Sequence, residues 1–489
     1  MLALTTLSAA LTGVMLVGIG LPDAVADGSR EITAMQRASL LMDTAYTIAF
    51  NNFASVASIA SSTTSGITTS LTILLLPDGS DYLTSTAEWH DAHNSERYSI
   101  LHGIITNYKS ATKNSCNDVL LGNWNKPQVQ TYALSSGGLI QSGVPGAHPI
   151  SVLAVNGTTL AVGISTTSSK TDPSLFLFDL SLGRPSYLGS IDNASSTTQG
   201  INGIALSSGY AYVANAARAD FSTCKAGPSC SQMQIFNVGN ARSITDVADV
   251  ELATATPPFA VGSDGQSIGK SIAYANGYAY LGTAKTGAAN GDEFNVFNVQ
   301  NPQSPVWLGG FSVGRSINRI VIHGTYAYLA TDDSSRELIV LDVHDPTHIS
   351  QVGTYDAPGA ANFGYGNDLA YQNTTLALGR TYSPNGPGLS ILSIASTAPS
   401  LISTENIASP SNPASVEAML MRSFLLFVLT NTSLEFFDIK NPYNPVPYAD
   451  TLTLPFGSVG TDITCQANTI FVSSVGADQT GYLTQITGS

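Results

Sequence analysis

The chain has 489 residues, of which 43% are hydrophobic and only 11% are Asp, Glu, Lys or Arg, so it can build a large core beneath a mostly uncharged polar surface. Its formal net charge of -15, with no Lys/Arg cluster, disfavours nucleic acid and anionic lipid headgroups as partners. The 44 Gly and 23 Pro favour β-structure with many turns, and the Ser/Thr/Asn-rich surface is common outside the cytoplasm.

An apolar segment opens the chain. Residues 2–22 carry no charge, and as a helix rising about 1.5 Å per residue they are long enough to cross about 30 Å of hydrocarbon. Three interpretations stay open: a secretory signal cleaved after Ala26, a plain transmembrane anchor, and the stem of a longer helix. The first lacks the usual positively charged start. We therefore assign residues 1–26 as a hydrophobic membrane or stem segment, with the membrane as the partner of residues 1–22.

Residues 27–115 are predicted to form a small α+β domain. From Ile32 to Ile59 apolar residues recur every three or four positions, which predicts an amphipathic helix. A Ser/Thr-rich break follows at 61–65, and then three strands are predicted, over residues 67–76, 82–89 and 98–108. We expect one long helix packed on a small antiparallel sheet.

Three stretches of this region carry a family resemblance: Met35-Gln36-Arg37-Ala38 through Asn52-Phe53, Ser85-Thr86-Ala87-Glu88-Trp89, and Gly103-Ile104-Ile105-Thr106-Asn107-Tyr108. Together with the apolar start they resemble the bacterial type IV pilin-like proteins. The family's processing motif is absent, because no Gly-Phe junction followed by Glu precedes the apolar run. The resemblance implies a helical stem and pilin-like subunits as partners, and the alternative is a generic anchor with a small α+β domain.

A strand motif repeats through the rest of the chain. Gly209-Tyr210-Ala211-Tyr212-Val213 recurs as Gly277-Tyr278-Ala279-Tyr280-Leu281 and Thr325-Tyr326-Ala327-Tyr328-Leu329. Each copy is followed by a second strand ending in Asp or Asn, and then by a turn. Each unit of roughly 40 to 60 residues has the length and content of one propeller blade.

Seven such blades are predicted within residues 116–489. The fold class is therefore mainly β: a seven-bladed β-propeller preceded by an N-terminal hydrophobic helix and a small pilin-like α+β domain. The last blade supplies only three strands, so we expect residues 127–134 to provide its outer strand and close the ring, which removes exposed sheet edges. The blades are predicted to start near residues 150, 201, 269, 317, 366, 415 and 458.

The repeat unit is specific enough to compare with a family. Leu338-Ile339-Val340-Leu341-Asp342-Val343, Asn301-Pro302-Gln303-Ser304-Pro305 and Asn441-Pro442-Tyr443-Asn444-Pro445 look like the LVIVD-repeat propellers of bacterial surface proteins. The resemblance covers about residues 125–489. It implies a binding or structural scaffold without common catalytic residues, so no active site and no cofactor are transferred.

Four cysteines lie at positions 116, 224, 230 and 465, a spacing that matches no zinc-ligand pattern. Cys224 and Cys230 bracket a turn-forming stretch, which predicts a disulfide between them. Ring closure would bring Cys116 towards the innermost strand that holds Cys465. A second disulfide and two buried free thiols are equally good interpretations of that pair.

Five polar residues are predicted to converge at one mouth of the central channel. Alignment of the blades on their Tyr-Ala-Tyr strands places them at equivalent positions of neighbouring innermost strands: Ser271, Arg319, Asp368, Glu417 and Asp462. They are candidates for binding a cation or a polar ligand. The favoured alternative is a rim in which the carboxylates and the arginine satisfy each other.

No assembled catalytic or metal centre is evident. The pair His90 and His93 lies in a polar turn without a third ligand, and no nucleophile elbow, phosphate-binding loop or dinucleotide fingerprint occurs. We therefore expect a non-enzymatic binding or adhesion module, displayed outside the cytoplasm from a membrane anchor or a pilus-like filament, with a surface glycan or protein as ligand. The alternatives are an extracellular propeller hydrolase acting on polysaccharide, which needs two carboxylates facing across a cleft, and a structural filament subunit.

Overall fold

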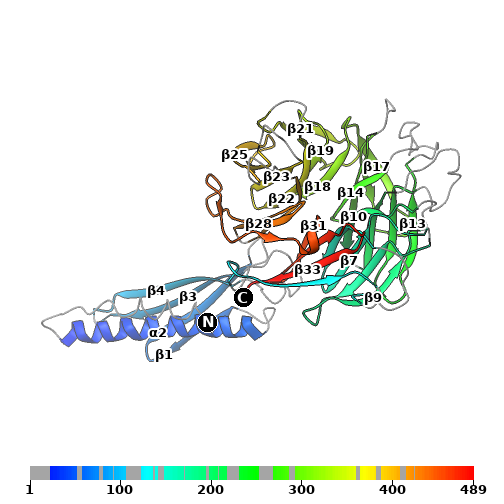
Figure 1. Ribbon diagram of the computed structural model, residues 1–489. Helices are drawn as coiled ribbons and strands as arrows, with labels where there is room; N and C mark the ends of the chain where they lie inside the picture. The colour runs from blue at the N-terminus through cyan, green and yellow to red at the C-terminus, as the bar shows by residue number, and fades with distance from the viewer. Residues whose placement is uncertain are drawn as a thin grey trace. The chain divides into compact units, whose positions relative to one another are not determined.

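The computed structural model describes most of the chain (Figure 1). The described residues are 22–51, 58–75, 81–91, 93–105, 123–135, 138–140, 148–169, 171–193, 198–207, 209–216, 231–252, 268–285, 292–359, 364–381, 387–407, 415–422 and 424–489. Two compact units divide the chain, Met1–Thr112 and Lys113–Ser489.

The first unit packs a single helix on an antiparallel sheet. Helix α2 spans Pro22–Asn51, and the sheet has the order β1 (Ile59–Thr64), β2 (Ile67–Leu75), β3 (Asp81–His90) and β4 (Glu96–Ile105). Along β3 buried and partly buried residues alternate, as expected for a sheet with one covered face. Small helix residues, Ala34 and Ala38, face the sheet, and Ser85 Oγ donates a 2.8 Å hydrogen bond to the Ala38 carbonyl.

Two predictions for this unit are wrong. The helix ends at Asn51 rather than near Ile59, and the Ser/Thr-rich segment predicted as a break is the edge strand β1. Threonine favours strands because its branched side chain fits a pleated surface, and Thr63 Oγ1 lies 2.8 Å from Thr68 Oγ1 on β2. Among the described residues no helix is long and apolar enough to span a bilayer. The apolar segment of residues 2–21 lies outside them.

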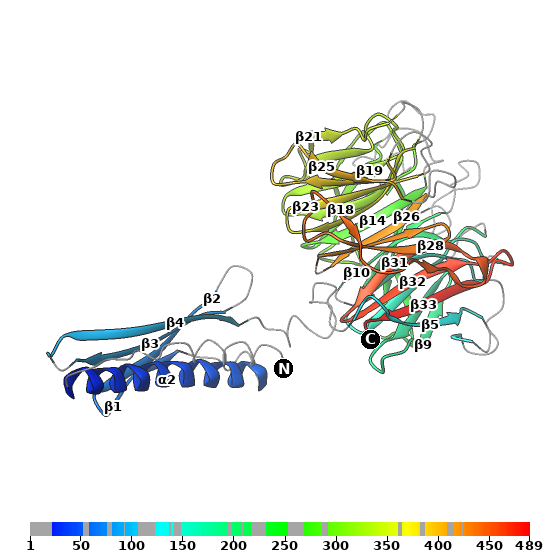
Figure 2. The ribbon, with the colours of Figure 1, turned by 60° about the vertical axis from the view of Figure 1, so that its left-hand side comes forward.

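The described residues of the second unit form seven antiparallel sheets (Figure 2). From the innermost strand outwards, the first four are β6 (Ile150–Asn156), β7 (Thr159–Ile164), β8 (Leu175–Asp179) and β9 (Ser186–Ile191); β10 (Ile201–Ser207), β11 (Tyr210–Asn215), β12 (Met233–Asn237) and β13 (Thr245–Val250); β14 (Gly269–Ala275), β15 (Tyr278–Thr283), β16 (Phe294–Asn298) and β17 (Val306–Phe311); and β18 (Ile317–His323), β19 (Tyr326–Thr331), β20 (Leu338–Asp342) and β21 (Ser350–Tyr355).

The remaining three sheets follow the same order. They are β22 (Gly366–Gln372), β23 (Thr375–Arg380), β24 (Leu389–Ser393) and β25 (Ser400–Glu405); β26 (Val416–Arg422), β27 (Leu425–Thr430), β28 (Ser433–Asp438) with β29 (Val446–Pro447) and β30 (Leu452–Thr453); and β31 (Val459–Gln466), β32 (Thr469–Val475), β33 (Gly481–Thr487) with β5 (Gln128–Ala133). A 3-10 turn, η3 (Pro455–Gly457), precedes β31.

The innermost strands contact one another in a closed series. β6 contacts β10, and the series continues through β14, β18, β22, β26 and β31 back to β6. This is the arrangement of a β-propeller. The sheet of β31 takes its outer strand from the start of the unit, because β5 pairs with β33 from Tyr482↔Ala133 to Thr487↔Gln128. Asn123 and Ser489 also exchange backbone hydrogen bonds of 2.7 and 3.1 Å.

The core lies between neighbouring sheets. The third strand of each of the first five sheets has four consecutive buried residues, as in Leu175–Asp179 and Leu338–Asp342, because both of its faces are covered. Leu175 and Leu177, for example, share one apolar cluster with Ile201 and Val213 of the next sheet. Each sheet therefore depends on its neighbours to bury its faces.

Cys465 lies on β31, where it is fully buried and disulfide-bonded. Cys116, Cys224 and Cys230 lie outside the described residues. The pairing of Cys116 with Cys465 and that of Cys224 with Cys230 stay predictions.

Candidate functional site

A β-bulge fixes the register at the channel end of every innermost strand. In β18 the bulge lies between Ile317 and Arg319, so Arg319 is the third residue of its strand and pairs with Ala330. Ser271, Asp368 and Asp462 pair equivalently with Gly282, Gly379 and Ser473. These four predicted site residues therefore occupy one equivalent position.

Glu417 does not share that position, so its predicted equivalence is wrong. In β26 the residue that pairs like Arg319 is Ala418, opposite Leu429, and Glu417 lies one residue earlier, in the bulge. Alignment on the apolar strand residues does not detect a bulge, because the extra residue changes which side chain faces the channel without changing the hydrophobic pattern.

Arg319 joins three sheets. Its Nε lies 3.0 Å from Asp368 Oδ1 on the neighbouring β22, and its Nη1 lies 3.9 Å from Asp462 Oδ1 on β31. Since β31 is three steps from β18 around the ring, the arginine reaches across the channel. Its side chain keeps 35% of its accessible surface, whereas those of Asp368 and Asp462 keep only 3% and 4%.

The two carboxylates also cap free backbone groups of neighbouring strands. Asp368 Oδ2 accepts a 2.5 Å hydrogen bond from the N–H of Met419 on β26. Asp462 Oδ2 accepts one of 2.7 Å from the N–H of Leu153 on β6, and its Oδ1 accepts one of 2.9 Å from Ile463. The innermost strand has no partner on its channel side, so these side chains satisfy donors that would otherwise be left unpaired.

Burial dominates the electrostatics of this cluster. It raises the pKa of Asp368 to about 6, opposed by Arg319 and reinforced by the charge of Asp462. Burial also raises the pKa of Asp462, again opposed by Arg319. Conversely, the charge of Asp368 raises the pKa of Arg319. The arginine thus stays charged and is what keeps two buried carboxylates ionisable.

Ser271 and Glu417 take part in other contacts. Ser271 Oγ donates a 2.9 Å hydrogen bond to the Ile317 carbonyl on the next innermost strand. Burial raises the pKa of Glu417, and a side-chain hydrogen bond with Asn367 lowers it in part. Among the described residues, neither side chain is paired with Arg319, so the predicted five-residue site consists of one three-residue bridge and two separate contacts.

A second set of side chains, which sequence reasoning missed, joins neighbouring innermost strands. Asn202 Nδ2 donates to the Gly269 carbonyl at 2.8 Å, Asn318 Nδ2 to Gly366 at 2.7 Å, and Asn367 Nδ2 to Val416 at 2.8 Å. Each asparagine is the second residue of its strand, and each acceptor is the first residue of the next. The signal was a polar residue directly before the aligned position; in the remaining units it is Ser151, Lys270, Glu417 and Thr461.

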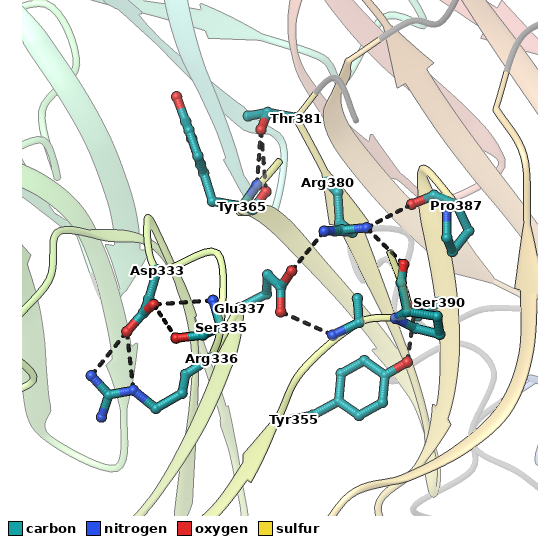
Figure 3. A network of polar contacts seen from close by, with 12 residues as sticks. Asp333, Ser335, Arg336, Glu337, Tyr355, Tyr365, Arg380, Thr381, Pro387 and Ser390 are labelled. Carbon is teal, nitrogen blue, oxygen red and sulfur yellow. Dashed lines mark hydrogen bonds and ion pairs between the residues drawn. The ribbon is translucent and has the colours of Figure 1, made fainter. Parts of the chain in front are cut away.

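A fully buried ion pair links the fourth and fifth sheets of the ring. Glu337 lies just before β20, and its Oε1 is 2.7 Å from Nη2 of Arg380 at the end of β23; the side chains are 0% and 1% exposed. Figure 3 shows Arg380 pointing at Glu337. Glu337 Oε2 accepts from the Ala357 N–H at 2.9 Å, and Arg380 Nη1 donates to the Pro387 carbonyl at 3.3 Å.

Asp333 organises the neighbouring turn (Figure 3). Its Oδ1 accepts from Ser335 Oγ at 2.8 Å, and its Oδ2 lies 2.9 Å from Nη2 of Arg336. Burial would raise the pKa of Asp333, but the hydrogen bonds from Ser335 and Arg336 outweigh it and lower that pKa. Both Glu337 and Asp333 therefore hold protein groups rather than presenting a free carboxylate.

Catalytic and metal chemistry find little support in these geometries. Among the described residues no group of three His, Cys, Asp or Glu side chains is placed to hold a metal ion. His90 ends β3 and His93 lies in the turn that follows. The channel carboxylates are occupied by N–H groups and by a guanidinium, so they do not form the pair across an open cleft that glycoside hydrolysis needs.

Comparison with known proteins agrees with the repeat. Residues 314–357, which contain β18 to β21, match the model of the LVIVD repeat. The chain contains an LVIVD repeat. No curated protein matches the sequence.

Solved structures with some similarity include a protein described as YCF48 bound to D1 peptide, at 7% identity and a TM-score of 0.47, covering 76% of this chain and 98% of that one. Another is Hsv2 of Kluyvelomyces marxianus, at 11% identity and a TM-score of 0.37, covering 67% and 89%. The propeller assignment rests on the strand order and the closed series of strand contacts.

Proposed function

We propose that this chain is a non-catalytic binding or adhesion module, displayed outside the cytoplasm on a seven-bladed propeller. The observation that carries the proposal is the bridge from Arg319 to Asp368 and Asp462. The most concentrated charges of the ring are engaged in joining sheets, which favours a rigid platform over a catalytic centre. Rigid scaffolds of this kind present ligands on their surfaces and loops.

The seven-bladed arrangement is supported by the seven sheets of the described residues and by the pairing of β5 with β33. The LVIVD match spans one unit, and the same strand order recurs in the other units. Seven radial sheets closed in this way would form a LVIVD-type ring over most of residues 116–489.

Display outside the cytoplasm is supported by three features. Residues 2–22 are uncharged and apolar, the surface has few charged residues, and Cys465 is disulfide-bonded, which suits an oxidising compartment. The helix α2 packed on β1–β4 suits the stem of a pilin-like protein as well as a generic anchor domain. The membrane, or pilin-like subunits, would then hold the propeller at the cell surface.

The test uses the full chain in mild detergent on an array of polysaccharides and surface proteins, followed by an assay for new reducing ends. We expect retention of a ligand without turnover. Turnover that disappears in Asp368→Asn, while a Asp345→Asn control keeps it, would instead establish the hydrolase. A chain that retains nothing on the array would overturn the binding role.

A further inference from the structure

A groove lies where the ring closes, between the outer strands of its first and last sheets. Its lining comes from Tyr132 and Ala133 of β5, from Gly138 and Leu139 just after β5, and from the segment Arg184 to Tyr187 that leads into β9. The cavity volume is ≈ 390 Å³, within the range of small-molecule sites.

Several contacts hold the groove in shape. Gln485 Nε2 on β33 donates a 2.6 Å hydrogen bond to the Gly183 carbonyl, which ties the last sheet to the turn before β9. The Leu139 N–H donates to the Ala133 carbonyl at 3.1 Å. The hydroxyl of Tyr187 lies 2.9 Å from Ser190 Oγ, so its ring is fixed at the wall. A preformed groove costs little ordering when a ligand binds.

Arg184 is the uncommitted charge in this groove. It is exposed, and within the described part of the chain it makes neither an ion pair nor a side-chain hydrogen bond. By contrast Arg315, Arg319, Arg336 and Arg380 all pair with carboxylates. The charge of Arg184 also acts on Tyr132, whose pKa is raised by burial and lowered in part by the arginine. A free guanidinium between two tyrosines is unusual in a chain of net charge -15.

We propose that this groove binds the carboxylate-bearing sugar of an acidic polysaccharide, a uronic acid, between Tyr132 and Tyr187 with its carboxylate on Arg184. The inference rests on the proposed binding function and names its ligand class. Tyrosine rings offer an apolar face and a polar edge, which suits the C–H face and hydroxyls of a sugar. Guanidinium binds a carboxylate through two parallel hydrogen bonds.

A peptide fits the lining less well. Peptide recognition in grooves usually relies on apolar or aromatic anchors buried in pockets. Here Leu139 is the largest aliphatic side chain of the lining, and the remaining side chains are tyrosines, Arg184, Ser186 and small residues with Pro185. The groove therefore favours a ring-shaped polar ligand with one negative charge.

The experiment measures binding of oligogalacturonate and of its methyl-esterified form to the full chain by titration calorimetry. We expect the acid to bind at least tenfold more tightly than the ester, and Arg184→Met to remove that difference. Arg242→Met is the matched control, because Arg242 lies in the corresponding turn of the next sheet, before β13, and is exposed. It should leave the affinity unchanged.

The outcomes separate this inference from the proposed function. Equal binding of acid and ester, or unchanged affinity in Arg184→Met, would overturn the groove while a ligand retained on the array still supports a binding module. Binding of an acidic peptide through Arg184 without any binding of the saccharide would overturn the sugar assignment. Absence of any retained ligand on the array would overturn both.

Discussion

Arg319 on β18 lies 3.9 Å from Asp462 on β31, although these strands belong to sheets three steps apart in the ring. A single side chain therefore connects the start and the end of the closed series through the channel, with Asp368 as an intermediate anchor at 3.0 Å. Replacement of this arginine tests whether the bridge stabilises the ring.

Arg319→Met should destabilise the propeller, because it leaves two buried carboxylates without their counter-ion. Breaking a buried pair from one side costs about 3–5 kcal/mol, and we expect about 2 kcal/mol here since the arginine is partly exposed to the channel. The measurement is the free energy of unfolding of the full chain in denaturant at pH 7.5.

The same variant should be less damaging at pH 5. Asp368 already has its pKa raised to about 6, and loss of Arg319 raises it further, so the carboxyl group becomes neutral at pH 5 and tolerates burial. Arg315→Met is the control, because Arg315 is 52% exposed and its 3.5 Å pair with Asp333 should contribute little. Equal losses for the two variants would contradict the bridge.

The sequence predicted the strand repeat and the propeller because each strand is a short apolar run bounded by turns, and the LVIVD match confirms the repeat. It placed Arg319, Asp368 and Asp462 at equivalent positions because their strands share one bulge. It misplaced Glu417, since a bulge adds a residue without altering the apolar pattern. Pairs between sheets, such as Glu337 with Arg380, depend on packing between units and leave no periodic signal.

The Glu337–Arg380 pair should show strong coupling in a double-mutant cycle. Glu337→Gln leaves a buried guanidinium and Arg380→Met leaves a buried carboxylate, so each single change should cost about 3–5 kcal/mol. The double variant should cost less than the sum, because no isolated charge remains. The free energy of unfolding of the four proteins measures this coupling.

Arg336→Met gives the matched comparison for that cycle. Arg336 also pairs with a carboxylate, Asp333, at 2.9 Å, but its side chain is 40% exposed. We expect at most about 1 kcal/mol from its loss. Additive effects of Glu337→Gln and Arg380→Met would show that the buried pair does not join the two sheets energetically.

Asp246 on β13 should make the protein less stable as pH rises. Burial and the neighbouring Asp249 raise its pKa to about 6 from 3.8, so the folded state binds this proton more tightly than the unfolded chain. Stability from this group is therefore complete below about pH 4 and lost as pH rises through 6. Asp246→Asn should raise the melting temperature at pH 7.5 and leave it unchanged at pH 4.

Asp345 supplies a control of opposite sign. Hydrogen bonds from Thr347 lower its pKa to about 2, so its contribution is present above about pH 4 and lost as pH falls towards 2. Asp345→Asn should lower the melting temperature at pH 7.5. If both asparagine variants shifted melting in the same direction at that pH, the assignment of the Asp246 shift to burial would be wrong.

Gly353 on β21 shows how closely neighbouring sheets approach. A Cβ at this position would lie 2.4 Å from the carbonyl oxygen of Thr397 in the next sheet. The equivalent residue of that next sheet is Ser403, whose Oγ donates a 2.6 Å hydrogen bond to the Pro442 carbonyl. Gly353→Ala should therefore cost about 1–3 kcal/mol of unfolding free energy through overpacking.

Gly353→Ser should cost less than Gly353→Ala, although serine is the larger residue. Its hydroxyl can donate to the Thr397 carbonyl as Ser403 does to Pro442, which offsets part of the displacement with a hydrogen bond worth about 1 kcal/mol. Denaturant unfolding of both variants decides the order. If alanine is the better tolerated of the two, the sheets are held apart by packing alone, and the turn carbonyl does not act as an acceptor between them.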